Sequence, residues 1–224
     1  EKKMRIRNVI KLVLGTVLAL GMSIDTLKAA GYPEKPITMI LPLGAGGSHD
    51  RNARVFTSVI PEFLGNAIIV KLMPGASGQV GTAAAARSKP DGYTLIFTHN
   101  YYDQLQKHVK KLPYNTDKDF VTVGKLNSGS FSVIVRADSP FKTWGQLVAY
   151  AKKNPGKLKF AHSGNWGATH APALQLFTEA GIVKNIVMVP YKGGGPSLRG
   201  FLAKEADFTF QFKSTIKAQG KKVR

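Results

Sequence analysis

Residues 37–54 read ITMILPLGAGGSHDRNAR and contain the signals that decide the fold. The segment from Ile37 to Pro42 has the β-branched and apolar composition of a short strand, and three glycines follow it within five residues. Beyond the glycines, apolar residues recur at helical spacing, namely Ala53, Phe56, Ile60 and Phe63. The stretch therefore predicts a strand, a glycine turn and a helix.

Such a turn is suited to an anion. Glycines let backbone N–H groups approach a ligand closely, and the start of a helix leaves its first N–H groups unpaired with a partial positive charge. Ser48 or Asp50 is expected to cap the helix. An ordinary turn between a strand and a helix has the same glycine pattern, so this stretch alone leaves both interpretations open.

Composition limits the class of protein. The chain has 224 residues, 43% of them apolar, which fits one large or two small globular domains. It has no cysteine, so a disulfide framework, a thiolate zinc site and a cysteine nucleophile are excluded. The five histidines are dispersed, and His162 and His170 lack the spacing of four that places two metal ligands on one helical face. We expect neither a metal nor a cofactor.

The first thirty residues have the layout of a secretory signal peptide. Basic residues precede an apolar run from Leu12 to Ile24, and small residues follow around Ala29 and Ala30. The run has thirteen residues, whereas a membrane span needs about twenty, so an uncleaved anchor is the weaker interpretation. We therefore expect residues 1–30 to be cleaved and the protein to be exported to the periplasm.

The net charge of +19 is spread over the chain, and residues 29–212 alone have a net charge of +10. A nucleic-acid-binding face would require clustered Lys and Arg or interleaved aromatic residues, whereas the lysines here are scattered. Small anions are the partners that this charge favours.

The pattern of strand and helix repeats along the chain and predicts an α/β fold with parallel sheets. Strands are expected at residues 67–72, 93–98, 120–126, 131–137, 158–162, 186–190 and 207–212, and helices at 82–87, 143–153, 168–180 and 196–203. We expect a hinge near residues 127–130, a first lobe over residues 31–128, a second lobe over 129–212, and a solvated basic tail over 213–224. Ligands of open α/β sheets bind beyond the carboxyl ends of the strands, so two such lobes would enclose a cleft.

The second predicted lobe repeats the opening motif. Residues 158–170 again predict a strand, a glycine-containing loop and a helix. A third glycine loop spans Tyr191 to Ser197, for which a flexible turn and a ligand contact are equally good interpretations.

Several motifs together resemble one family. They are Tyr32-Pro33-x-Lys35-Pro36-Ile37, Gly46-Gly47-x-x-Asp50-x-x-Ala53-Arg54, Pro74-Gly75-Ala76-x-Gly78-x-x-Gly81, Pro90-Asp91-Gly92-Tyr93-Thr94-Leu95, Leu112-Pro113-Tyr114, Asp119-Phe120 and Pro190-Tyr191-Lys192-Gly193-Gly194-Gly195-Pro196. This combination is similar to the periplasmic solute-binding proteins of tripartite tricarboxylate transporters, the Bug family. The resemblance implies a monomeric, two-lobed periplasmic binding protein of type II that captures a small organic carboxylate for a membrane transporter.

The resemblance also implies a binding site, because the family holds one carboxylate between two strand–loop–helix motifs. The corresponding residues are Leu43, Gly44, Ala45, Gly46, Gly47, Ser48, His49 and Asp50 on one side, Ser163, Gly164, Asn165, Trp166, Gly167, Ala168 and Thr169 on the other, and Thr98, His99 and Asn100 as further contacts. Three residues depart from the family pattern: Leu43 replaces a phenylalanine, His49 a small hydroxyl residue and Trp166 a glycine. For His49 two interpretations are open: a titratable positive charge near the site, or a side chain that faces solvent.

Two further expectations complete the prediction. The family chain returns to complete its first lobe, so this chain is interpreted as a truncated member with an unpaired strand edge beside Ile37–Leu41. The alternative function is an exported hydrolase-like α/β enzyme that uses Ser163 and His170, with Asp50 as a third member. No Gly-x-Ser-x-Gly motif accompanies Ser163, so we expect a protein that is not an enzyme.

Overall fold

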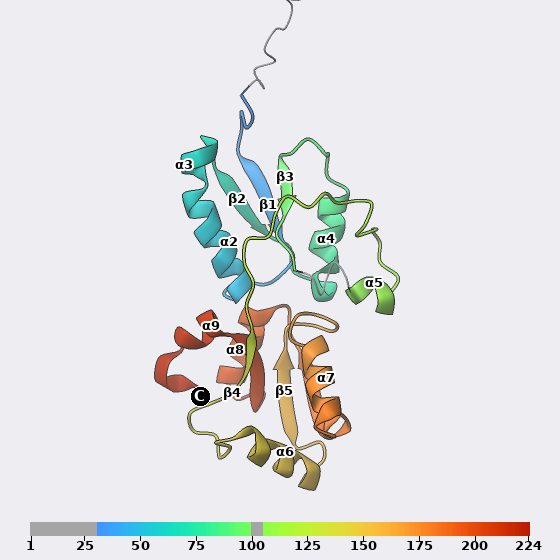
Figure 1. Cartoon of the computed structure of the whole chain (residues 1–224), viewed down its shortest axis with the longest axis vertical. Coiled ribbons are helices and arrows are strands. Elements are labelled where there is room, and N and C mark those ends of the chain that lie inside the picture. The colour runs from blue at the N-terminus through green and yellow to red at the C-terminus, as the bar shows by residue number, and fades with distance from the viewer. Residues whose placement is uncertain (1–30, 100–104) are drawn as a thin grey trace, which may run out of the picture. The chain divides into compact units, whose positions relative to one another are not determined.

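The computed structural model describes residues 31–99 and 105–224 (Figure 1). Residues Pro36–Arg224 form one compact unit that contains two separate β-sheets. The predicted signal peptide and Asn100 lie outside the described residues.

The first sheet has three parallel strands in the order β2-β1-β3. These strands are β1 (Ile37–Leu41), β2 (Ile68–Leu72) and β3 (Thr94–Ile96). Ile37 is in register with Ile68 and Thr38 with Thr94, so β1 is paired along both of its edges. The expectation of an unpaired edge beside Ile37–Leu41 is therefore wrong: β3, which follows two helical crossovers, occupies that edge.

Alternation along β1 places side chains on both faces of this sheet. Ile37, Met39 and Leu41 pack with Ala53 of α2 (Ser48–Val59), and the short α3 (Pro61–Leu64) extends the same cover. On the other face α4 (Gln79–Ala86) contacts β1 and β3 and begins after the 3₁₀ turn η1 (Ala76–Gly78). Gly81 allows this approach, because a Cβ atom there would lie 2.8 Å from the carbonyl oxygen of Met73.

The strand predicted at residues 120–126 does not form. The short helix α5 (Gln106–Val109) is followed by turns, and residues 120–130 then pair with no strand of the described part. Val121 is 91% exposed and Val123 is 86% exposed. The composition is β-like, but a strand requires a ladder partner, and this segment has none among the described residues.

The second sheet has four strands in the order β4-β7-β5-β6, with β4 antiparallel to β7 and the other pairs parallel. They are β4 (Phe131–Val135), β5 (Leu158–His162), β6 (Ile186–Pro190) and β7 (Phe208–Phe212). Because β5 and β7 are interior and parallel, their carboxyl ends open at the same edge of the sheet.

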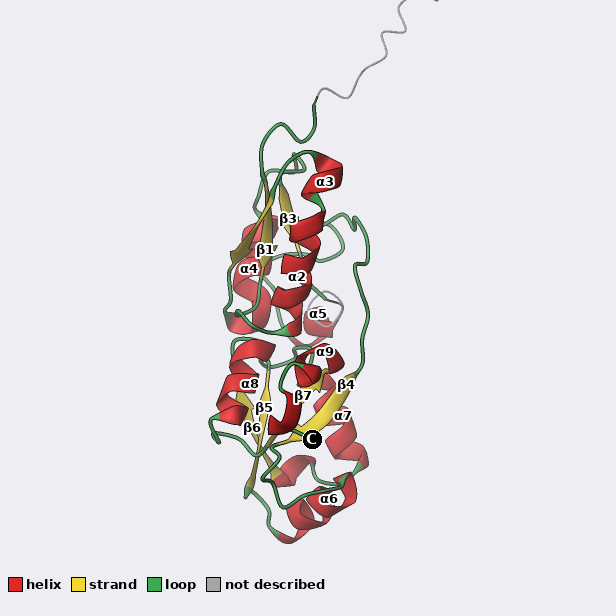
Figure 2. Cartoon of the chain, turned by 90° about the vertical axis from the view of Figure 1, so that its left-hand side faces the viewer, coloured by secondary structure: helices red, strands yellow, loops and turns green. Residues whose placement is uncertain are grey.

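Figure 2 shows the second sheet between α8 (Gly194–Leu202) on one side and α6 (Trp144–Lys153) and α7 (Ala171–Glu179) on the other. Phe160, Phe177 and Phe208 are fully buried on the α6 and α7 side, with aromatic centroids 5.1–5.7 Å apart. Burying such side chains stabilises a fold by roughly 1.5–3 kcal/mol each, so this aromatic cluster is the main core of the second sheet. The turn η3 (Val183–Asn185) leads into β6.

The basic tail is part of the fold, so the expectation of a solvated end is wrong. It contains α9 (Lys213–Lys217) and the turn η4 (Gly220–Lys222), and the backbone of Arg224 exchanges two hydrogen bonds of 2.9 and 3.0 Å with Val135 of β4. Thr215 is fully buried and Val223 is 9% exposed, while the lysines point outward. The tail folds back because its inward-facing residues, such as Thr215 and Val223, are buried against the second lobe, although lysines dominate its composition.

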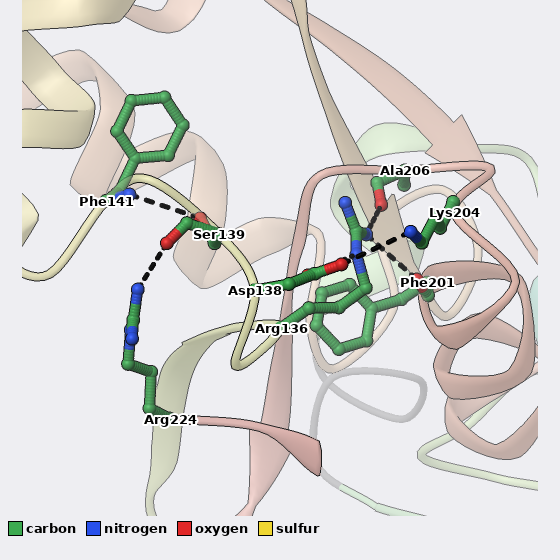
Figure 3. A network of polar contacts seen from close by, with 8 residues as sticks. All are labelled: Arg136, Asp138, Ser139, Phe141, Phe201, Lys204, Ala206 and Arg224. Atoms are coloured by element: carbon green, nitrogen blue, oxygen red, sulfur yellow. Dashed lines mark hydrogen bonds and ion pairs between the residues drawn. The ribbon is translucent and has the colours of Figure 1, made fainter.

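Arg136, which follows β4, contacts the end of α8 and the loop after it (Figure 3). Its Nη1 donates to the carbonyl oxygens of Phe201 at 3.0 Å and Ala206 at 2.5 Å, and its guanidinium lies 5.4 Å from the Phe201 ring centroid. Arg224 donates a hydrogen bond to the carbonyl oxygen of Ser139 in the same network. Asp138 pairs with Lys204 at 3.2 Å, and this hydrogen-bonded ammonium lowers the pKa of the Asp138 carboxyl group.

Candidate functional site

Hydrogen bonds to Asp50 hold the first glycine loop, residues 43–50, in its conformation. The two carboxylate oxygens of Asp50 accept hydrogen bonds of 2.9 Å from the backbone N–H of Gly46 and from Nε of Arg54. Gly47 is the N-cap of α2 and receives no side-chain cap, so Ser48 and Asp50 do not cap the helix in the way the sequence predicts. The negative charge of Asp50 is thus used within the loop, and its side chain does not line the cavity described below.

The second glycine loop is folded by Thr169 and His170. Thr169 Oγ1 accepts the N–H of Ser163 at 2.8 Å and donates to Ser163 Oγ at 2.9 Å. His170 Nδ1 accepts the N–H of Trp166 at 3.0 Å, which holds Trp166 at φ 59°. Since Ser163 Oγ accepts from Thr169, its own hydroxyl proton is left to donate elsewhere.

A small cavity lies where these two loops meet. Its volume is about 30 Å³, close to that of a single water molecule. Residues from both loops, from the carboxyl end of β7 and from the start of α8 line it: Leu43, Gly44, Gly47, Ser48, His49, His99, Ser163, Ala168, Thr169, Gly194, Phe210, Gln211 and Phe212. The first and second sheets thus both contribute to one site.

The cavity offers hydrogen-bond donors but no charged side chain among its lining residues. In the described part of the chain, the N–H groups of Ser48 and His49 at the start of α2 have no acceptor, and neither do those of Ala168 and Thr169 in the second loop. A helix start with free N–H groups and a partial positive charge attracts anions. The Ser163 hydroxyl adds one more donor, so the arrangement is suited to a carboxylate or another small oxyanion.

Two histidines form one wall of the cavity. The rings of His49 and Phe97 are stacked with centroids 4.2 Å apart, and His99 meets His49 edge-on at 5.4 Å. Burial lowers the pKa of His49 to about 4 and that of His99 to about 3. His49 is therefore uncharged at neutral pH, and its interpretation as a positive charge near the site is wrong because burial disfavours the cation.

A second pair of histidines lies behind the second loop. His162 at the end of β5 is fully buried, and its ring centroid lies 4.4 Å from that of His170. Burial lowers the pKa of His162 to about 4 and also lowers the pKa of His170. These rings support the loop through the bond to Trp166 and do not line the cavity.

The structure brings nine of the predicted site residues to the cavity: Leu43, Gly44, Gly47, Ser48, His49, His99, Ser163, Ala168 and Thr169. The other described candidates do not line it: Ala45, Gly46, Asp50, Thr98, Gly164, Asn165, Trp166 and Gly167. Several of these shape the loops instead; for example, the carbonyl oxygen of Ala45 accepts a hydrogen bond of 3.3 Å from Arg199 of α8.

Four lining residues are absent from the predicted site: Gly194, Phe210, Gln211 and Phe212. Gly194 belongs to the third glycine loop, for which ligand contact was one of two open interpretations. Phe210 to Phe212 are the last residues of β7, and the rule that ligands sit at the carboxyl ends of strands was the signal that pointed to them.

The alternative catalytic triad is not assembled. Ser163 Oγ is bonded to Thr169, His170 Nδ1 to Trp166, and Asp50 to Gly46 and Arg54. Each member has its own partners in a different part of the loops, so the arrangement in which a base activates a serine is not present.

Within residues 31–99 and 105–224, no group of three or more His, Cys, Asp or Glu side chains is placed to hold a metal ion. In the same ranges, no helix combines the length and the apolar character that crossing a membrane requires.

Residues 52–222 match the family model of the tripartite tricarboxylate transporter family receptor. The chain belongs to this family. A relative from Cupriavidus necator, a UPF0065 protein in the gbd 5' region, is 33% identical over 198 residues, which cover 85% of this chain and 58% of the relative. The receptor family is a family of solute-binding proteins, which also argues against the hydrolase alternative.

Solved structures show the same fold. The periplasmic binding protein BugD is 30% identical with a TM-score of 0.77, and the match covers 86% of this chain and 64% of BugD. MatC from Rhodopseudomonas palustris, solved with bound malate, is 28% identical with a TM-score of 0.77, over 86% of this chain and 66% of MatC. The fold is thus the two-lobed α/β fold of periplasmic binding proteins, and the chain spans about three-fifths to two-thirds of the length of these relatives.

Proposed function

We propose that this chain is a periplasmic receptor that captures a small organic carboxylate for a tripartite tricarboxylate-type transporter. The observation that carries the proposal is the set of unpaired N–H groups from Ser48, His49, Ala168 and Thr169 around one uncharged cavity. They come from two loops that belong to different sheets, so one anion would join both lobes.

The energetics of such a clamp are adequate without a cationic side chain. Hydrogen bonds to a charged group contribute about 1.5–3 kcal/mol each, so four of them supply roughly 6–12 kcal/mol before the cost of association. A micromolar complex requires about 8 kcal/mol, which places the clamp in the range of weak to micromolar affinity once the Ser163 hydroxyl and apolar contacts are added.

Capture requires the lobes to part. A cavity of about 30 Å³ holds one water molecule and is too small for an organic acid. We take residues 31–128 and 129–212 as the two lobes, joined by the extended segment before β4, and propose that they open to admit the solute and close around it. The malate bound to MatC supports a carboxylate as the solute class.

The remaining parts of the proposal follow from the family and the sequence. Export by residues 1–30 would bring the receptor to the periplasm, where it would act as a monomer that delivers its solute to membrane subunits of the transporter. No nucleic acid is involved in this function.

A thermal-shift screen over mono-, di- and tricarboxylates tests the proposal. A ligand at 100 times its dissociation constant stabilises the folded state by about 2.7 kcal/mol, which raises the melting temperature of a domain of this size by roughly 5–11 °C. Ser163→Ala should reduce the shift, because it removes a donor from the cavity, whereas Ser132→Ala on the exposed face of β4 should not. The absence of a shift with every acid would overturn the proposal.

A further inference from the structure

Resting on the proposed function, we propose that His49 selects carboxylates that also carry an uncharged hydrogen-bond donor, above all a hydroxyl group. From the sequence alone, a positive charge was one of two open interpretations of His49. Four observations on the His49 ring and its surroundings carry the inference.

The tautomer of His49 is fixed by its neighbour. Nε2 lies 2.7 Å from the carbonyl oxygen of Phe97, and a carbonyl oxygen only accepts hydrogen bonds, so Nε2 carries the proton. The ring is held in this orientation by parallel stacking on Phe97, with an angle of 11° between the planes. Rotation of the ring would break both contacts at once.

The second nitrogen of His49 is therefore an acceptor. In the uncharged ring Nδ1 has a lone pair and no proton, and no hydrogen bond to it is found in the described part of the chain. Nδ1 is not among the fully buried side-chain atoms that lack a partner, so it retains some accessible surface, and His49 is one of the residues that line the cavity. A solute in the cavity thus meets a bare lone pair on this wall.

A lone pair repels a carboxylate and attracts a donor. The carboxylate of the solute would turn toward the free N–H groups of the two loops, and a donor elsewhere on the solute would turn toward Nδ1. The carboxylate of the solute is thus recognised by backbone N–H groups, and its hydrogen-bond donor by the lone pair of Nδ1.

The absence of charged lining residues narrows the donor to an uncharged one. An ammonium donor would be buried without a carboxylate partner among the lining residues, which is costly. A hydroxyl group has no such cost. The solute class that fits is therefore a hydroxy acid.

Matched pairs of acids that differ only by a hydroxyl group test this inference by isothermal titration calorimetry on the full chain. The pairs are malate with succinate and lactate with propionate, each enantiomer taken separately. One neutral hydrogen bond contributes about 0.5–1.5 kcal/mol, so we expect the hydroxy acid of a pair to bind up to about tenfold more tightly.

Two variants of His49 separate the hydrogen bond from the shape of the ring. His49→Phe keeps an aromatic ring to stack on Phe97 but has no acceptor, and it should bring the two acids of a pair within about twofold of each other. His49→Asn restores an acceptor oxygen and should keep part of the preference. His108→Phe is the matched control, because His108 is exposed on α5 and does not line the cavity, and it should leave the preference unchanged.

The outcomes distinguish this inference from the proposed function. Binding of acids with equal affinity within each pair by the unmodified chain would overturn the role of His49 and leave the receptor function in place. Failure of every carboxylate to bind would overturn the receptor function itself. The comparison of paired acids uses the unmodified chain. The inference can therefore be tested even if His49→Phe does not fold.

Discussion

The backbone N–H of Gly44 donates a hydrogen bond of 2.8 Å to the carbonyl oxygen of Lys192. This bond joins the first glycine loop, beside the first sheet, to the third glycine loop, beside the second sheet. Glycines of the two loops are in close contact around this bond. A Cβ atom on Gly47 would lie 2.9 Å from the nitrogen of Gly195, and a Cβ atom on Gly195 would overlap the carbonyl oxygen of Ala45. The third loop is therefore glycine-rich because its backbone must touch the first loop when the lobes are closed.

Gly195→Ala tests this contact. The added methyl group would collide with the first loop, so we expect the carboxylate affinity to fall by at least tenfold, because closure brings the donors of both loops together. Affinity is measured by calorimetry with the best acid from the thermal-shift screen. Gly145→Ala in α6 is the control, since its Cβ atom would come no closer than 3.9 Å to any heavy atom outside its own helix backbone and immediate chain neighbours. An undiminished affinity in Gly195→Ala would show that closure does not use this contact.

Asp50→Asn is expected to destabilise the first lobe. Asp50 is 5% exposed and its carboxylate bonds both Gly46 and Arg54, so loss of the charge should reduce the free energy of unfolding by about 1–3 kcal/mol. The loop should also become less able to present Ser48 and His49 to a solute. Denaturant unfolding measures the change.

Asp117→Asn is the matched control for that experiment. Asp117 also pairs with a cation, Lys107, at 2.8 Å, but its side chain is 62% exposed. Exposed pairs contribute about 0–1 kcal/mol, so the control should change stability little. Equal effects of the two substitutions would contradict the role given to Asp50.

Stability should fall as the pH drops below neutrality. Burial lowers the pKa of His49 to about 4, of His99 to about 3 and of His162 to about 4, and also lowers that of His170. Between the unfolded value near 6.5 and the folded values, the unfolded chain binds more protons than the folded one. The stability that these groups contribute is therefore present above about pH 6.5 and is lost as the pH falls toward 4.

Melting temperatures measured from pH 7.5 to 4.5 check this prediction. Each histidine contributes a slope of up to about 1.4 kcal/mol per pH unit within its window. The titratable neighbour of His49 is His99, and that of His162 is His170, so the charges within each pair oppose one another and steepen the loss. His49→Phe should flatten the profile, whereas His108→Phe on exposed α5 should not. A profile that is flat over this range would contradict the burial of the four rings.

Hydrogen exchange should separate β1 from the segment at residues 120–126. Backbone N–H groups of Ile37–Leu41 lie between two paired strands and should exchange slowly. Residues Val121 to Leu126 pair with no described strand, and both valines of that segment are almost fully exposed, so their amides should exchange within seconds. Slow exchange at Val121 and Val123 would show that this segment is paired in solution.

The local fold was already determined by the sequence. The strand, glycine turn and helix of residues 37–54 occur as predicted, and so do the paired helices and strands of the second sheet, because each depends on the spacing of apolar residues and on glycine at turns. The resemblance to tripartite tricarboxylate transporter receptors likewise rested on local motifs and is confirmed by the family match.

The tertiary structure alone decided which of these pieces meet. Phe120–Leu126 has the composition of a strand but lacks a partner, while the lysine-rich tail packs on β4, because pairing depends on what lies alongside a segment rather than on its own residues. The charge of His49 in the site also depends on what surrounds the side chain. Its identity indicated a charge, but burial against Phe97 and His99 keeps the ring uncharged, and the cost of burying a cation is set by surroundings that come from distant parts of the chain.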